Sequence, residues 1–163
     1  MTGVAHATGS FQRVGAVTLN SGENILLSAV TDGTYGYFGT ETGPGRVVKV
    51  DLANMTRVDA VTLPAGEDYL LTAVTDGTYG YFGTTFASPG RVVKVDLATM
   101  TRVDAVTLSS GEDNLRSAIT AGTYGYFGTD TGPGRVVKVN LGSPPPTPAP
   151  EPSPAPVGPA YTG

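Results

Sequence analysis

The hydrophobic pattern of this chain repeats three times. The stretch Asp32–Leu52, DGTYGYFGTETGPGRVVKVDL, returns almost unchanged at Asp76–Leu97 and, with small changes, at Ala121–Leu141. In each copy, short runs of valine, tyrosine, phenylalanine and threonine are separated by glycine, proline and aspartate, which is typical of strands joined by tight turns. The starting positions 32, 76 and 121 give a repeat of 44 or 45 residues, and this repeat sets the architecture of the chain.

Each repeat predicts four short strands. In the first copy they are ILLSAV from Ile25, TYGYFGT from Thr34, RVVKVDL from Arg46 and TRVDAVTL from Thr56. The Asp-Gly pair before the aromatic strand is a strong hairpin signal, because glycine accepts the positive φ of a tight turn. We expect the first glycine of each aromatic strand to leave room where a neighbouring sheet approaches. These glycines are Gly36, Gly80 and Gly125.

The fourth strand of the repeat also occurs before the first copy. Phe11–Leu19, FQRVGAVTL, matches TRVDAVTL at Thr56–Leu63 and Thr101–Leu108, whereas no such strand follows the last copy at Leu141. The sequence thus contains three strands of each kind, and one repeat is divided between the two ends of the repeat region.

Three segments differ in composition. Residues 1–10 are small and polar and predict an N-terminal arm, and residues 11–141 form the three-repeat domain. Residues 142–163, GSPPPTPAPEPSPAPVGPAYTG, alternate proline with small residues, which favours an extended polyproline helix. We expect this tail to be a spacer or an anchor on a neighbouring protein.

The order of the strand motifs points to a known kind of repeat. AVTDGTYGYFGT followed by GRVVKVDLATMTRVDAVTL resembles the blade repeat of YVTN-type β-propellers, and the resemblance covers residues 11–141. The chain departs from the usual pattern because it lacks a proline before the Asp-Gly turn and stops at three units. The resemblance implies a propeller fold and a tendency to bind, without indicating a ligand.

The number of repeats predicts an oligomer. Propellers typically carry 4–8 blades, so chains with three blades each reach this range as a homodimer of six. The N-terminal strand of one chain would then complete the last blade of the other. Two alternatives remain: a β-trefoil or β-prism, which also has three repeats, and an open assembly in which the donated strand builds a filament.

Charge and composition give no catalytic, metal or cofactor site. The net charge is −4 without a basic cluster, which argues against a nucleic-acid partner, and cysteine is absent. The one histidine, His6, lies in the predicted arm, where nothing would hold it for catalysis. We expect the repeated arginines and lysines to be solvated edge residues or partners of repeated acids, and Asp32 and Asp76 to set turns. The repeated acids are Glu23, Glu67 and Glu112.

A unique binding site would break the symmetry of the repeats. Tyr69 replaces Ile25 and Asn114, and Arg116 stands where the other copies have leucine. An extra residue in the second copy brings Phe86 into the turn TFASPG. We therefore take Tyr69, Phe86 and Arg116 as candidate binding residues.

These observations favour a non-enzymatic structural or interaction protein. We expect an oligomerising scaffold that attaches to a larger assembly, of the virion or surface decoration type, through its arm and tail. The alternative is a multivalent carbohydrate-binding module, in which repeated weak sites gain avidity. No apolar run is long enough to span a membrane or resembles an export signal. Cytoplasmic synthesis is therefore expected, and virion or surface association stays open.

Overall fold

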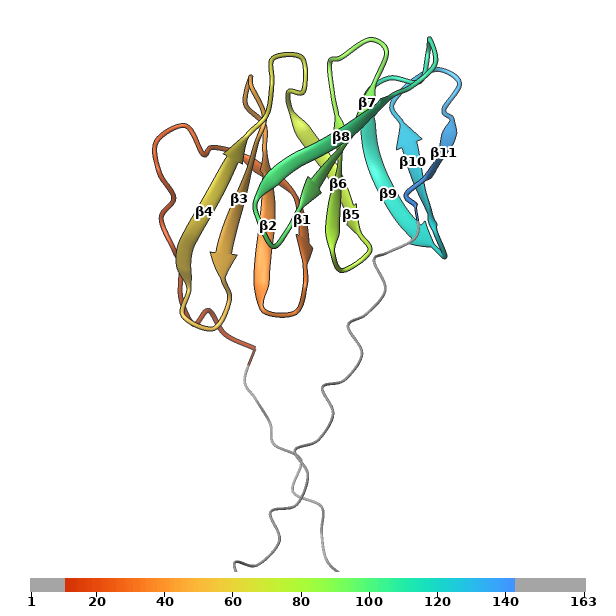
Figure 1. Cartoon of the computed structure of the whole chain (residues 1–163). Helices are drawn as coiled ribbons and strands as arrows, with labels where there is room; N and C mark the ends of the chain where they lie inside the picture. The colour runs from red at the N-terminus through yellow and green to blue at the C-terminus, as the bar shows by residue number, and fades with distance from the viewer. Residues whose placement is uncertain (1–10, 143–163) are drawn as a thin grey trace, which may run out of the picture.

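The computed structural model describes residues 11–142, and in this range the chain is all-β, with strands and no helix. The strands form three antiparallel sheets that lie side by side (Figure 1). The predicted arm at residues 1–10 and the tail from residue 143 onward lie outside the described residues. The all-β prediction is confirmed.

Each sheet is formed by consecutive strands. The first contains β1 (Leu26–Thr31), β2 (Tyr35–Thr40), β3 (Arg46–Asp51) and β4 (Thr56–Thr62). The second contains β5 (Leu70–Thr75), β6 (Tyr79–Thr84), β7 (Arg91–Asp96) and β8 (Thr101–Thr107). The third contains β9 (Leu115–Ala121), β10 (Tyr124–Thr129) and β11 (Val136–Asn140). Two sheets therefore have the four strands that the repeat predicts, and the third has three.

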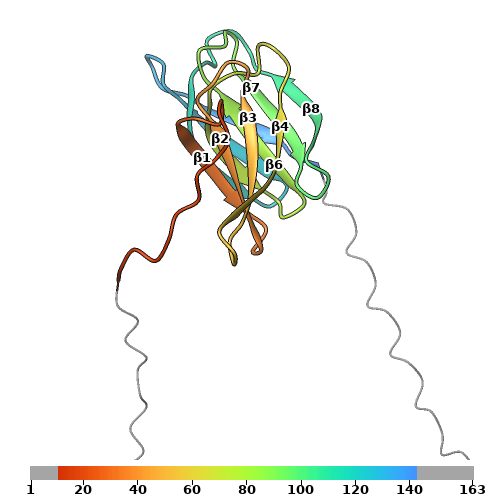
Figure 2. The same ribbon diagram turned by 90° about the vertical axis from the view of Figure 1, so that its left-hand side faces the viewer.

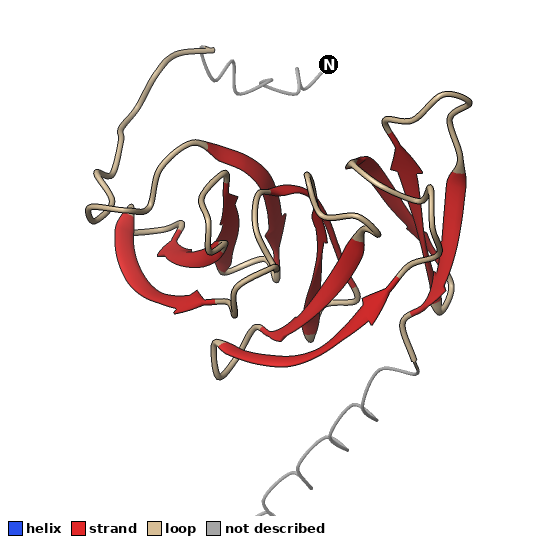
Figure 3. Cartoon of the chain, turned by 90° about the horizontal axis from the view of Figure 1, so that it is seen from above, coloured by secondary structure: helices blue, strands red, loops and turns tan. Residues whose placement is uncertain are grey.

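The strand predicted at Phe11–Leu19 does not form within a single chain. The segment lies beside the first sheet, at the end of the molecule away from the third, and its side chains are largely exposed (Figures 1 and 3). Among residues 11–142, the sheet that lacks a fourth strand is the third, and its open edge is β11. The segment remains a loop because this vacant position lies at the opposite end of the described chain.

The Asp-Gly hairpins have the predicted geometry. Gly33 and Gly77 adopt φ values of 96° and 92°, in the left-handed region that glycine enters without strain. The carboxylate of Asp32 accepts hydrogen bonds from the backbone N–H groups of Thr34 and Tyr35, each at 2.8 Å. The prediction that this aspartate sets a turn is confirmed.

Apolar side chains hold neighbouring sheets together. One cluster joins the first and second sheets around Tyr37, Leu70 and Phe82, and another joins the second and third around Leu115 and Phe127. Strand β1 packs against β5, and β5 packs against β9. No comparable contact joins β9 to β1 within residues 11–142. The three sheets therefore do not close about a threefold axis, as the trefoil and prism alternatives require.

The glycines at the sheet contacts are not those that the sequence analysis selected. A Cβ atom on Gly36 would lie 2.8 Å from Phe38 and 3.0 Å from Leu52, both in its own sheet, which is seen from its outer side in Figure 2. A Cβ atom on Gly39 would lie 2.9 Å from Leu70 of the second sheet. The prediction was wrong in this detail because the aromatic ring of the same strand folds back over its first glycine.

Candidate functional site

The structure brings two of the three candidate residues together. Tyr69 precedes β5 and Phe86 lies in the turn between β6 and β7, and their rings meet edge to face with centroids 5.3 Å apart. The backbone N–H of Phe86 donates to Oδ1 of Asn114 at 3.0 Å, which ties this turn to the third sheet. The Phe86 side chain is 66% exposed, so the pair presents an aromatic surface to solvent.

Arg116 lies apart from this pair. It projects from β9, and its Nε lies 3.3 Å from Oδ2 of Asp130, with both side chains exposed. Among the described residues, no hydrogen bond, ion pair or ring contact connects Arg116 to Tyr69 or Phe86. The three candidates therefore do not form one site.

The part of the chain described by the structure offers no metal centre. No group of three His, Cys, Asp or Glu side chains within residues 11–142 could hold a metal ion. The same residues include no helix with the length and apolar character needed to cross a membrane.

The repeated tyrosines are used within the fold. The Nζ atom of Lys49 lies 4.2 Å from the centre of the Tyr35 ring and donates to the Leu97 carbonyl of the second sheet at 3.1 Å. Lys94 covers Tyr79 in the same way at 3.9 Å, and Lys138 covers Tyr124 at 3.8 Å. A cation over the ring face stabilises this arrangement and occupies the surface on which a sugar would stack.

A second tyrosine in each complete repeat links one sheet to the next. The Tyr37 hydroxyl donates to the Asp32 carboxylate and lies 3.1 Å from the carbonyl oxygen of Leu97 in the second sheet. Burial and the contact with Asp32 raise the pKa of Tyr37. Burial also opposes the ionisation of Asp32, but hydrogen bonds from the Tyr35 backbone and the Tyr37 hydroxyl outweigh it and lower the pKa of Asp32. The ionised carboxylate thus anchors the contact between the sheets.

A glutamate–arginine pair fastens the fourth strand to its sheet. In the first sheet, the Arg57 Nε lies 2.8 Å from Oε2 of Glu23, and this contact lowers the pKa of the buried Glu23. In the second sheet, Arg102 binds the buried Glu67 with the same geometry, also at 2.8 Å. In the third, the described residues give Glu112 no basic partner, and its carboxylate accepts a hydrogen bond from the Ser109 backbone. The predicted pairing is thus confirmed for two of the three glutamates.

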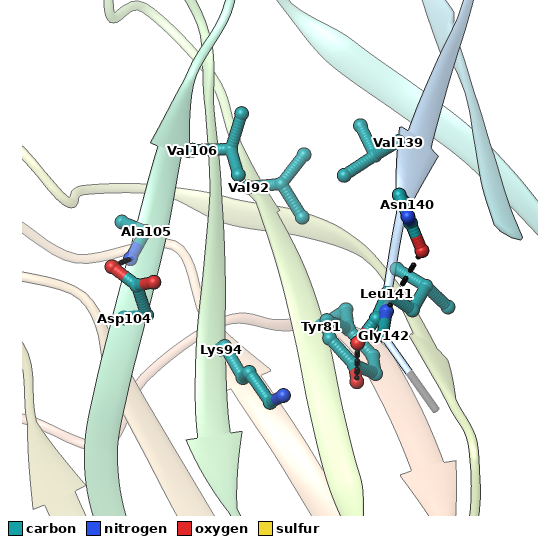
Figure 4. A pocket seen from close by; sticks show the side chains of 10 residues that line it. All are labelled: Tyr81, Val92, Lys94, Asp104, Ala105, Val106, Val139, Asn140, Leu141 and Gly142. Carbon is teal, nitrogen blue, oxygen red and sulfur yellow. Dashed lines mark hydrogen bonds between the residues drawn. The ribbon is translucent and has the colours of Figure 1, made fainter. Parts of the chain in front are cut away.

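The open edge of the third sheet borders a groove and a cavity. The groove, of about 540 Å³, runs between the end of β8 and β11 and includes Glu112 and Val136 in its wall. The cavity, of about 260 Å³, lies at the other end of β11 between Tyr81, Val106 and Leu141 (Figure 4). Both hollows lie beside β11, where the other two sheets have their fourth strand.

The first and third sheets expose side chains that the interior sheet contacts bury. Leu52 of the first sheet is 41% exposed, whereas its counterpart Leu97 in the second sheet is 2% exposed. Val136 of the third sheet is 74% exposed, whereas its counterpart Val92 is 2% exposed. The two outer faces therefore correspond to the two sides of the contact that joins successive sheets inside the chain.

Comparisons with known proteins identify the fold alone. No protein-family model and no curated protein sequence matches the chain. The structure of Kuenenia stuttgartiensis hydrazine synthase is similar over 70% of this chain, with 16% identity and a TM-score of 0.58. The structure of the RRP9 WD40 repeats is similar over 63%, with 11% identity and a TM-score of 0.50. This chain spans 33% and 32% of those two chains. WD40 repeats form propeller blades, and the repeated sheets of this chain are β-propeller-like.

Sequence reasoning missed the unpaired Glu112. The paired glutamates precede their arginines by 34 and 35 positions. The same spacing from Glu112 reaches Pro146 and Thr147, where the chain has no arginine. The asymmetry was therefore present in the sequence, but it has no meaning until the structure shows which charges pair.

Proposed function

We propose that this chain is a non-enzymatic interaction protein, a β-propeller scaffold that assembles with a second copy of itself. The observation that carries the proposal is the exposure of Leu52 and Val136, whose counterparts are buried between sheets. A face that is buried inside the chain and exposed at its ends provides an apolar contact surface for another copy. The resemblance to YVTN-type repeats belongs to the same proposal.

Two copies give a ring of ordinary size. The face of the third sheet in one copy packs on the face of the first sheet in the other, and the same contact forms again at the second junction. Such a head-to-tail contact yields a closed ring when its rotation closes and a filament when it does not. Two chains supply six blades, within the usual range of 4–8, so we favour the closed dimer.

The scaffold role is supported by what the charged residues do. Among residues 11–142, the paired glutamates and arginines bind one another, the turn aspartates bind the backbone, and the three lysines cover tyrosine rings. Attachment to a larger assembly through residues 1–10 and 142–163 is part of the proposal, and apart from Gly142 these segments lie outside the described residues. Removing residues 143–163 should abolish incorporation into the parent assembly, and unchanged incorporation would refute this attachment.

The mass of the purified chain in solution tests the scaffold proposal. Native mass spectrometry and sedimentation should give twice the chain mass of 16.6 kDa at micromolar concentration. A folded monomer at that concentration would exclude the dimeric ring. A broad series of species larger than the dimer would show that the chains form the open filament and not the closed ring.

A carbohydrate-binding function is the second candidate, and the exposed Tyr69–Phe86 pair favours it. Exposed aromatic rings can bind the apolar faces of sugars. A glycan array with the wild-type protein should then show binding that Phe86→Ala removes, while Arg116→Ala, outside the pair, retains it. An array without any bound glycan excludes this candidate and leaves the scaffold proposal intact.

A further inference from the structure

The vacant position beside β11 matches a segment of the same sequence. Strands β4 and β8 carry the sequence TRVDAVT, and the segment Phe11–Leu19 reads FQRVGAVTL. Its residues Arg13, Ala16 and Val17 correspond to Arg102, Ala105 and Val106 of β8. The sequence therefore contains the strand that the third sheet lacks.

Within one chain this segment cannot reach that position. In the repeat, the fourth strand of a sheet leads directly into the next sheet, and hydrogen bonds fix this junction: Gly45 donates to the carbonyl of Glu67, and Leu63 donates to Gly45. By the same connection, Phe11–Leu19 leads directly into the first sheet, on the side away from the second. The second sheet separates it from β11 (Figure 1). The strand that fits there must come from another molecule.

The pairing of β7 with β8 gives the expected register. Val92 pairs with Val106, Val93 with Ala105, and Val95 with Arg102. Transferred to the third sheet, β11 would pair Val137 with Ala16 of a second copy. The register places Arg13 of that copy beside Val139, at the height where Arg102 meets its glutamate in the second sheet.

The unpaired charges of the two ends are complementary. Glu23 and Glu67 each hold an arginine of the fourth strand, and Glu112 has the same position in the third sheet. Arg13 lies in the segment Phe11–Leu19, which joins none of the three described sheets, and its side chain is exposed. If residues 11–19 of another molecule paired with the edge strand β11, their Arg13 would bind Glu112. This ion pair would be equivalent to the glutamate–arginine pairs of the first and second sheets.

The cavity beside Tyr81 fits the first residue of this segment. Phe11 corresponds to Met100, which precedes β8 and is buried in the cluster between the first and second sheets. The equivalent space between the second and third sheets is the 260 Å³ cavity, with Val106 and Leu141 in its wall. Phe11 itself is fully exposed in the single chain. Among residues 11–142, the Phe11 ring is thus left uncovered, and the cavity at the matching position, whose wall includes Val92, Val106 and Leu141, is left unfilled.

We infer that residues 11–19 of a second copy form the fourth strand of the third sheet, with Arg13 bound to Glu112 and Phe11 in the cavity beside Tyr81. The inference rests on the proposed self-assembly and specifies how the two copies are joined. Each copy gives its strand to the other, so the two junctions of the ring are identical and each contains one such ion pair.

Charge reversal tests the exchange. Arg13→Glu places two acids at both junctions of the dimer, and Glu112→Arg places two bases there. Losing the ion pair of a desolvated junction costs at least about 2 kcal/mol, or about a factor of 30 in the dissociation constant. Because each variant disrupts both junctions of its homodimer, its dissociation constant should rise by about the square of this factor, or roughly 900-fold. Arg116→Glu makes the same charge change on β9, at the opposite edge of the third sheet from β11, and should weaken dimerisation less than Arg13→Glu does.

Mixing the two reversed chains gives the decisive result. In a mixed dimer, one junction pairs Glu at position 13 with Arg at position 112, and the other keeps the native pair. Native mass spectrometry should show the heterodimer at near wild-type affinity. Because Arg13 is exposed and makes no hydrogen bond or ion pair among residues 11–142, we expect Arg13→Glu to fold, and far-ultraviolet circular dichroism checks Glu112→Arg. If the latter does not fold, Arg13→Glu alone decides.

The outcomes separate this inference from the proposed function. A wild-type dimer that Arg13→Glu leaves unchanged overturns strand exchange and retains self-assembly. If both variants dimerise more weakly but their mixture forms no heterodimer, Arg13 and Glu112 pair within one chain. That result also overturns the strand exchange. A monomeric wild-type protein overturns both.

Discussion

Removing the hydroxyl oxygen of Tyr81 measures how much a single atom contributes to the contact between the second and third sheets. This oxygen lies 2.8 Å from the Asp76 carboxylate and 2.9 Å from the carbonyl oxygen of Leu141 in the third sheet, and the side chain is buried. The hydroxyl carries one hydrogen and shares it between these two oxygens, so Tyr81→Phe removes one hydrogen bond to a charged group, which contributes about 1.5–3 kcal/mol. Because Asp76 keeps the backbone N–H groups of Thr78 and Tyr79, its own desolvation is not added. We expect a loss of about 1.5–3 kcal/mol in the free energy of unfolding.

Chemical denaturation provides the assay. The free energy of unfolding of Tyr81→Phe, from urea titration followed by circular dichroism, is compared with that of Tyr79→Phe as the matched control. The Tyr79 hydroxyl has no hydrogen bond among the described residues, and its ring remains in Tyr79→Phe to hold Lys94. The control should therefore change stability by less than about 0.5 kcal/mol. Equal effects of the two variants would refute the reasoning, because the hydroxyl of Tyr81 would then contribute nothing beyond its neighbour.

Three further predictions follow from the repeat. In the folded state Arg57 lowers the pKa of Glu23 from its ordinary value of 4.5. The stabilising effect of this ion pair is therefore complete above about pH 5 and is lost as the pH falls through the folded pKa. Glu23→Gln should flatten this part of the curve of stability against pH, and an unchanged slope would contradict the prediction. A Cβ atom on Gly45 would lie 2.6 Å from a backbone carbonyl oxygen, so Gly45→Ala should lower the free energy of unfolding by about 1–3 kcal/mol, measured by thermal melts. Gly134 has its nearest neighbours at 3.9 Å, so Gly134→Ala should fold normally and only weaken association, measured by sedimentation. The chain has no cysteine, so Ala16→Cys combined with Val137→Cys should give a covalent dimer on oxidation if the inferred register is correct, and exclusively monomeric protein on a denaturing gel would exclude that register.

Local signals in the sequence predict most of the fold. The Asp-Gly turns, the aromatic strand and the valine-rich strand gave the order of the strands within each sheet, because hairpin pairing depends on residues close in sequence. The position of the predicted strand at Phe11–Leu19 could not be settled in this way. Its pairing depends on which edge lies open beside it, and that is a property of the arrangement of the sheets.

The candidate site was less predictable. Differences between the copies identified Tyr69 and Phe86, which do meet, because an insertion in one turn changes the surface next to it. The same approach selected Arg116, which lies elsewhere with Asp130. It did not separate Glu112 from Glu23 and Glu67, because the three residues are identical in kind and Glu112 differs only in lacking a basic partner among the described residues.

The segment before β1 has the sequence of a fourth strand, and the last described sheet lacks one. In the ring proposed above, adding or deleting a whole repeat would leave both of these ends unaltered. Three chains of two repeats would supply as many blades as two chains of three, and they would meet through the same residues. Duplication of a single stretch of gene would thus alter the number of subunits in the ring without requiring any new contact to evolve.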